Sequence, residues 1–148
     1  MAESSRHRLT PAEHDERRRI ALDRRDRVDA ALINLGLDAE HLGTLRPFFD
    51  EHGVLTQIPM QRAKRLLLLD LLSQRFLPGQ LYSERRVNLI LGQFNSDWAA
   101  LRRYLVDEDF LDRRDGFYWR TGGTFDIGDD DGWTRERRGS TTTRQWAD

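Results

Sequence analysis

Arginine is the residue type in this sequence with the most evident chemistry. Of the 24 basic residues, all but Lys64 are arginine. The guanidinium group presents a flat fork of hydrogen-bond donors, which suits phosphate groups and the exposed edges of bases. A genome rich in G and C also favours arginine codons, so composition alone does not assign these side chains a role. The positions of the arginines along the chain must therefore indicate whether they have a role in binding.

The other reactive residue types do not form a recognisable catalytic or metal site. Without cysteine, the chain has no disulfide, no thiol nucleophile and no cysteine-based metal site. No glycine-rich phosphate loop and no nucleophile elbow is present. The histidines are scattered, with no carboxylate at ligand spacing, and are His7, His14, His41 and His52. We therefore expect neither an enzyme, nor a cofactor, nor a bound metal.

The charge balance is weaker than that of a dedicated nucleic-acid-binding protein. The formal net charge is −1. Residues 60–120 carry 11 basic and 8 acidic side chains, which gives +3, whereas residues 36–59 carry 1 and 4. A domain built mainly to bind DNA usually has a more basic balance. Any contact with nucleic acid must therefore depend on where individual arginines lie.

Composition divides the chain into four segments. We expect a disordered start, an N-terminal helical region, a folded domain and a flexible tail, at residues 1–9, 10–58, 59–121 and 122–148. The tail is poor in apolar residues except for Trp133 and Trp146, which could attach it to the core. No stretch approaches the roughly 18 apolar residues of a membrane span, and no secretory signal is evident. The sequence therefore predicts a cytoplasmic protein that does not use a membrane.

A long helix is predicted from Pro11 to Leu35. Thr10 and Glu13 have the spacing of a capping box with proline at the first helical position, and Gly36 is a natural left-handed stop. Residues 38–52 should then form one kinked helix or two short ones. The alternating charges of the first half of the long helix fit a solvated, ion-paired helix, or a face that contacts nucleic acid or a second subunit.

The apolar stripe on this helix suggests an oligomer. Val28, Leu32 and Leu35 are more apolar than a lone surface helix requires, and helix-turn-helix proteins usually read paired half-sites. We therefore expect a homodimer in which the N-terminal helix contributes to the interface. The alternative is that the stripe packs on its own domain.

Residues 59–121 predict a helix-turn-helix with a β-ribbon attached. The expected order is helix, short strand, helix, three-residue turn, helix and hairpin, with helices at 61–76, 83–94 and 97–107. The predicted fold class is therefore mainly α: a winged helix-turn-helix (α+β) with a three-helix core and a two-stranded β wing, preceded by N-terminal helices.

The wing is predicted from a hairpin signature. Asp115-Gly116 lies between two runs that favour β-structure, and this dipeptide is typical of a two-residue turn. If Arg114 pairs with Phe117, then Leu111 and Tyr118 share the face of the ribbon that packs on the helices.

The candidate nucleic-acid-binding residues follow from this architecture. The third helix enters the major groove with its first turns, and the wing follows the DNA backbone or the minor groove. A helical wheel places Ala100 and Arg103 outward, with Ala99 and Arg102 at the border. We expect small residues to allow close approach and arginines to meet phosphate or base edges. The predicted set is Asn95, Ser96, Ala99, Ala100, Arg102, Arg103, Arg113, Arg114 and Arg120.

A purely structural role for part of this set stays open. Arg102 or Arg103 could instead pair with acidic neighbours such as Asp107 and Asp109 and fix the packing of the helix. The wing arginines have a stronger claim on phosphate, because the tip of a wing is exposed.

Many spaced residues over about 45–121 resemble one known family. The string comprises Leu55-Thr56-Gln57-Ile58-Pro59, Lys64-Arg65, Phe76 with Pro78-Gly79, Tyr82-Ser83-Glu84 with Val87-Asn88, Asp97 with Leu101-Arg102-Arg103-Tyr104-Leu105-Val106-Asp107, and Phe110-Leu111 with Tyr118-Trp119. It is similar to domain-of-unknown-function family 2087, which occurs alone or appended to bacterial regulators of the ArsR or LuxR type. The resemblance implies a regulatory setting. It also implies that Asn88 and Arg102, which match the family's pattern, are hydrogen-bonding residues that support the fold.

Two functional hypotheses remain. The first is a bacterial winged-helix DNA-binding protein that regulates transcription by contacting double-stranded DNA. The second is a winged-helix module that docks onto a protein partner or senses a small ligand without touching DNA. The low net charge and the appended occurrence of the family favour the second, whereas the polar outward face of the third helix favours the first.

Overall fold

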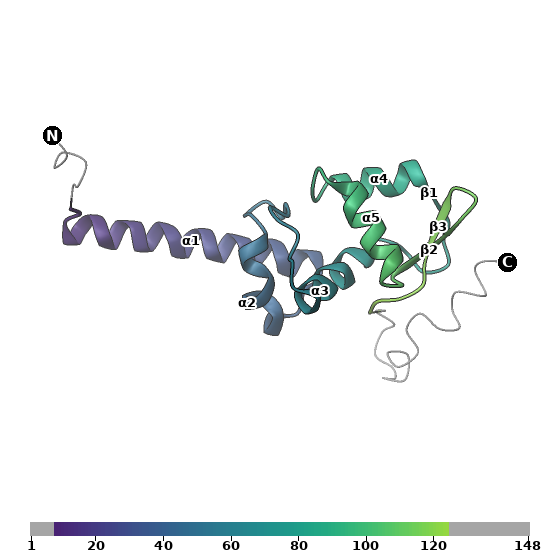
Figure 1. Cartoon of the computed structure of the whole chain (residues 1–148). Coiled ribbons are helices and arrows are strands. Elements are labelled where there is room, and N and C mark those ends of the chain that lie inside the picture. Colours follow the sequence, from purple (N-terminus) through teal and green to yellow (C-terminus); the bar gives the residue numbers. More distant parts are fainter. Residues whose placement is uncertain (1–7, 125–148) are drawn as a thin grey trace.

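The protein is mainly helical, with a small antiparallel sheet at the end opposite its N-terminal helix (Figure 1). The computed structural model describes residues 8–124, so the expectations for residues 1–7 and for Trp133 and Trp146 lie outside the described residues. The helices are α1 (Pro11–Leu35), α2 (Leu42–Leu45), α3 (Arg62–Ser73), α4 (Glu84–Gly92) and α5 (Trp98–Asp107), with two 3₁₀ turns, η2 (Ala39–His41) and η3 (Arg46–Phe48). The strands are β1 (Tyr82–Ser83), β2 (Leu111–Arg114) and β3 (Phe117–Arg120). None of the helices in this part of the chain combines the length and apolar character needed to cross a membrane.

The ends of α1 confirm the sequence prediction. The hydroxyl of Thr10 accepts a hydrogen bond from the amide of Glu13 over 3.1 Å, and the Glu13 carboxylate accepts one from the amide of Thr10 over 2.7 Å. At the other end, Gly36 adopts a left-handed conformation with φ 107°. A side chain is rarely stable there, so glycine ends the helix where the sequence predicts.

Only the C-terminal part of α1 packs on the rest of the chain. Val28 and Leu32 are 5% and 0% exposed, and Leu35 packs against the same core. The Asp29 carboxylate also accepts two hydrogen bonds from Arg46, at 2.6 and 2.9 Å, which tie α1 to η3. Val28 and Leu32 therefore pack on their own domain, which is the alternative stated from the sequence, and they are not exposed for a dimer interface.

One hydrophobic core joins the N-terminal helices to α3, α4, α5 and the sheet. The leucines Leu68, Leu69, Leu71 and Leu72 of α3 are at most 2% exposed, as the predicted central helix requires. Leu55 belongs to this core, and its amide donates to the carbonyl of Phe94 over 2.8 Å. The segment before α3 is thereby fixed to the turn between α4 and α5.

The sheet has the strand order β1-β3-β2, so β1 adds a third strand to the predicted two-stranded wing. Arg114 pairs with Phe117, as predicted, and both Leu111 and Tyr118 are 1% exposed on the inner face of the ribbon. The same register places Arg120 directly opposite Leu111. The side chain of Arg120 therefore leaves the backbone on the side of the ribbon that faces the core.

The chain is held against α3 where it leaves β3. The carboxylate of Asp70 accepts hydrogen bonds from the amide and the hydroxyl of Thr124, at 2.6 and 2.8 Å. Gly122 and Gly123 are buried, and a Cβ added at Gly122 would lie 2.5 Å from the carbonyl oxygen of Asp109. Residues 122–124, which the sequence assigns to the tail, are thus part of the packed structure.

Candidate nucleic-acid interface

The turn between α4 and α5 fixes where α5 begins. Asp97 caps the helix by accepting from the amide of Ala100 over 3.3 Å, and Asn95 accepts from the amide of Asp97 over 2.7 Å. The amide nitrogen of the Asn95 side chain donates to the carbonyl of Leu55 over 2.7 Å. Asn95 therefore holds the turn with both ends of its side chain. Ser96, next to it, is exposed.

The exposed face of α5 is narrower than the helical wheel predicts. Ala100, placed outward from the sequence, is 9% exposed and belongs with the buried residues, and Ala99 is half-buried. A wheel assigns a helix one inward face, but α5 contacts α3, α4 and β2, which together cover much of its circumference. The expectation that Ala100 lines a DNA groove is therefore wrong. Arg103 is exposed, as predicted.

Arg102 links α5 to α4. Its Nη1 donates to Oδ1 of Asn88 over 2.6 Å and lies 3.6 Å from a carboxylate oxygen of Glu84. Its guanidinium carbon lies 5.5 Å from the centre of the Trp98 ring. The family resemblance implies that Asn88 and Arg102 are hydrogen-bonding residues that support the fold, and the structure shows that they bond to each other. Neither Arg102 nor Arg103 forms an ion pair with Asp107 or Asp109 in the described structure.

Two arginines of the β2–β3 hairpin are exposed, as predicted. The side chain of Arg114 is 78% exposed and has Asp115 at 3.9 Å, itself 89% exposed. Arg113 is also exposed, and its cross-strand partner is Tyr118, whose hydroxyl donates to Glu84 over 3.1 Å. Its hydrogen bond with Tyr118, followed by the nearby charges of Glu84 and Asp107, raises the pKa of Arg113. Arg113 is therefore oriented by its neighbours, whereas Arg114 extends into solvent.

Arg120 is a core residue, and its assignment as a phosphate ligand is wrong. It is 3% exposed. Its Nε donates to the carbonyl of Gly122 over 2.9 Å, its Nη1 to that of Phe76 over 3.3 Å, and its Nη2 to that of Thr124. Burial lowers the pKa of Arg120 to about 10, which still leaves it charged at neutral pH. Because it stands opposite Leu111 at the base of the ribbon, it is turned away from the exposed tip.

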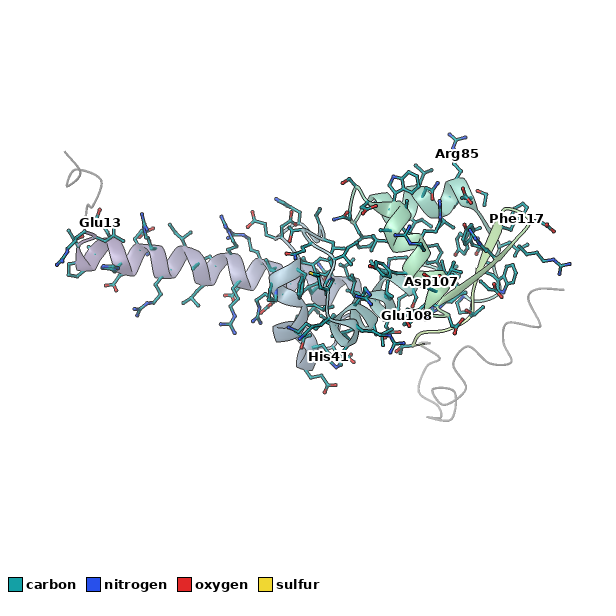
Figure 2. The ribbon with its side chains drawn as sticks, in the orientation of Figure 1. Glu13, His41, Arg85, Asp107, Glu108 and Phe117 are labelled. Atoms are coloured by element: carbon teal, nitrogen blue, oxygen red, sulfur yellow. The ribbon has the colours of Figure 1, made fainter. Side chains whose placement is uncertain are left out.

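Four of the nine predicted residues remain exposed and available: Ser96, Arg103, Arg113 and Arg114. Sequence reasoning missed two further exposed arginines, Arg85 and Arg86, in the first turn of α4. Arg85 points away from the body (Figure 2). Their exposure follows from helical spacing, because they lie between the cap Ser83 and the buried Val87.

One histidine does have carboxylates at ligand spacing, contrary to the sequence analysis. The ligand atoms of Asp38, Glu40 and His41 all lie within 4.8 Å of one another, and Nε2 of His41 is 3.5 Å from Glu40. The two carboxylates are exposed and the histidine is half-buried. The sequence signal was visible in Asp38-x-Glu40-His41, but it lies outside the α4–α5 region.

The segment that contains α3, α4, α5 and the sheet carries a known family's domain. Residues 54–120 match the model of a family described as "Uncharacterized protein conserved in bacteria (DUF2087)". The resemblance stated from the sequence is thereby confirmed for residues 54–120. Neither a curated protein nor a solved structure matches the chain.

Proposed function

We propose that residues 59–121 form a winged helix-turn-helix that binds double-stranded DNA, as part of a bacterial transcriptional regulator acting in the cytoplasm. The element order α3, β1, α4, α5, β2, β3 supports this fold, because a helix-turn-helix followed by a β-hairpin defines it. In that architecture α5 is the recognition helix and the turn at Asp115-Gly116 is the tip of the wing.

The observation that carries the proposal is the exposure of Arg103 on α5. It forms no ion pair or hydrogen bond with any residue of the described part of the chain, so its guanidinium is free to reach a base edge or a phosphate. Ser96 supplies a second exposed polar group at the start of the same helix. Arg114 supplies a cation on the wing that is not buried by its neighbours.

Acidic side chains limit the size of the proposed contact. Asp107 ends α5, and Asp112 and Asp115 lie on the hairpin beside Arg113 and Arg114. Phosphates are repelled at those positions, so the proposed contact uses the first two turns of α5 and the wing arginines only. We therefore expect modest affinity that falls steeply with salt, because each neutralised phosphate releases bound counterions.

A titration of the full chain with a labelled random duplex tests the proposal. At about 50 mM salt we expect retention of the duplex, and near 200 mM a loss of most of it. An Arg103→Ala/Arg114→Ala variant should bind much more weakly. The matched control, Arg18→Ala/Arg19→Ala on α1, removes the same charge from the exposed helix and should bind as the parent does. If the parent does not retain the duplex at the lower salt, the proposal is overturned. If the control variant binds DNA as weakly as the test variant, the DNA contact lies on α1.

A second candidate function is docking onto a protein partner. It is favoured by exposed apolar side chains on α4 and beside it: Leu89, Leu81 and Phe117 are 60%, 54% and 47% exposed. Phe117 lies on the hairpin near the start of α4, because Ser83 pairs with it across the sheet (Figure 2). Absence of DNA binding at low salt, with a folded protein, would favour this candidate.

A further inference from the structure

The N-terminal half of α1 is exposed to solvent. It extends away from the body (Figure 1), and residues 11–27 are exposed around the whole helix. Ile20 is 50% exposed near the middle of this projecting segment. An open groove where the segment leaves the body is lined in part by Ile20, Ala21, Val28 and Phe49, so an apolar surface continues from Ile20 to the core.

The charges on the Ile20 side of α1 are arranged antisymmetrically. Helical spacing of three and four residues places seven side chains on this face: Glu13, Glu16, Arg17, Ile20, Asp23, Arg24 and Arg27. Where a residue before Ile20 on this face is acidic, the residue equally far after Ile20 is basic, and the reverse also holds. Glu16 and Arg24 are equally far from Ile20 and opposite in charge, and so are Arg17 and Asp23.

We propose that α1 binds α1 of a second copy of this chain, antiparallel, with the two-fold axis at Ile20. Antiparallel pairing puts residues equally far from Ile20 opposite each other, so Glu16 meets Arg24 of the second copy and Arg17 meets its Asp23. Glu13 likewise faces Arg27, and Ile20 packs on Ile20. Each pair occurs twice, as an interface with two-fold symmetry requires. The occupant is a second copy because the face is complementary to itself.

Contacts within one chain leave the centre of this face available. Glu16 pairs with Arg19 on the same helix, and Arg27 lies 2.9 Å from Glu51 of the body. Exposed ion pairs contribute little to stability, so replacing them with ion pairs between the two copies costs little free energy. Arg17 and Arg24 form no ion pair or hydrogen bond with described residues.

The proposal predicts a weak, salt-sensitive dimer. Only Ile20 is a large apolar residue at the centre of the face, so burial of apolar surface is small and exposed charges supply the specificity. Such charges are screened at about 1 M salt, where the Debye length falls to about 3 Å. The dimer differs from the one expected from the sequence, because Val28 and Leu32 do not take part. It is independent of whether the protein binds DNA.

Cysteine cross-linking tests the register directly, because the chain has no cysteine. The axes of packed helices lie about 8–10 Å apart, which brings facing Cα atoms within the roughly 7 Å that a disulfide tolerates. Ile20→Cys should give a cross-linked dimer under mild oxidation at low salt. The matched control is Leu22→Cys, because Leu22 is similarly exposed, at 49%, on the opposite side of α1. Equal cross-linking of both variants, or of neither, overturns the proposal.

A charge exchange tests the pairing without relying on the stability of one variant. Glu16→Arg/Asp23→Arg makes the centre of the face wholly basic, and Arg17→Glu/Arg24→Glu makes it wholly acidic. By sedimentation equilibrium at low salt, each variant alone should be monomeric, and an equimolar mixture should form a heterodimer. The control Asp15→Arg/Asp26→Arg, away from the face, should dimerise like the parent. A monomeric parent at tens of micromolar, or a mixture that does not associate, overturns the proposal.

Discussion

Arg102 of α5 donates a 2.6 Å hydrogen bond to Asn88 of α4, so the two helices are joined by a pair of polar side chains. We predict a coupling of about 1 kcal/mol between them, as for a partly buried bond to a charged group. A double-mutant cycle of Asn88→Ala and Arg102→Ala, followed by urea unfolding, measures it. Additive losses of stability would show that the bond does not contribute.

Replacement of Arg120 should lower the stability of the protein more than any substitution at the exposed tip of the β2–β3 hairpin. We predict that Arg120→Ala lowers the free energy of unfolding by about 2–4 kcal/mol, because it leaves a cavity and removes the donor from three carbonyls. Arg114→Ala, an exposed control, should change it by less than about 0.5 kcal/mol. A stable Arg120→Ala protein with weaker DNA binding would restore Arg120 as a phosphate ligand.

Arg114 should position DNA without reading its sequence. If the proposed function holds, Arg114→Ala weakens binding to all duplexes alike and lowers the salt slope by about one unit, as loss of one phosphate contact does. Titrations of two unrelated duplexes over a range of salt measure both effects. A loss confined to one sequence would contradict this role.

Under the proposed function, Arg103 should behave differently, because it lies on the exposed face of α5. Arg103→Ala should cost about 1–3 kcal/mol on the preferred site and relax the preference at one base pair. Selection of sites from a random pool, by parent and variant, reveals the change. The variant must first show unchanged thermal unfolding. If it binds every duplex as the parent does, this face of α5 is not the DNA-binding surface.

The Arg62–Glu108 pair should contribute a measurable pH dependence of stability. Arg62 donates to both carboxylate oxygens of Glu108, at 3.1 and 2.7 Å, and this hydrogen bonding lowers the pKa of Glu108 below its usual 4.5. A lowered carboxyl pKa gives stability that is fully present above the ordinary pKa and is lost as pH falls through the lowered one. Glu108→Gln should therefore lower the melting temperature at neutral pH and make little difference in strong acid.

The control for this prediction is Asp15→Asn, a carboxyl in the projecting part of α1, far from Arg62. Its melting temperature should follow the parent's at every pH. A difference between parent and Glu108→Gln that persists unchanged below pH 3 would mean that the pair acts through packing and not through charge.

Local signals in the sequence predicted the elements well. The capping box of Thr10 and Glu13, the left-handed stop at Gly36, and the turn at Asp115-Gly116 act over a few residues, and the structure places each as predicted. The register of the hairpin followed from the same turn, because a two-residue loop fixes which residues face each other.

The site was harder to predict, because exposure depends on contacts between distant segments. Ala100 is buried by neighbours on more than one side of α5, which a single wheel does not represent. Arg120 could have been assigned correctly, since the predicted pairing of Arg114 with Phe117 already set it opposite Leu111. Its three carbonyl partners, however, come from the segment after α3 and from residues after β3, and only the folded chain brings them together.

The projecting α1 also determines how the molecule moves through solution. Its exposed residues 11–27, at about 1.5 Å each, extend roughly 25 Å from the body, whereas a compact protein of 148 residues has a radius of gyration of about 15 Å. Drag rises with elongation, so even a monomer should leave a gel-filtration column earlier than a compact protein of equal mass. The number of copies in a particle must therefore come from light scattering or sedimentation equilibrium, because elution volume reports shape together with mass.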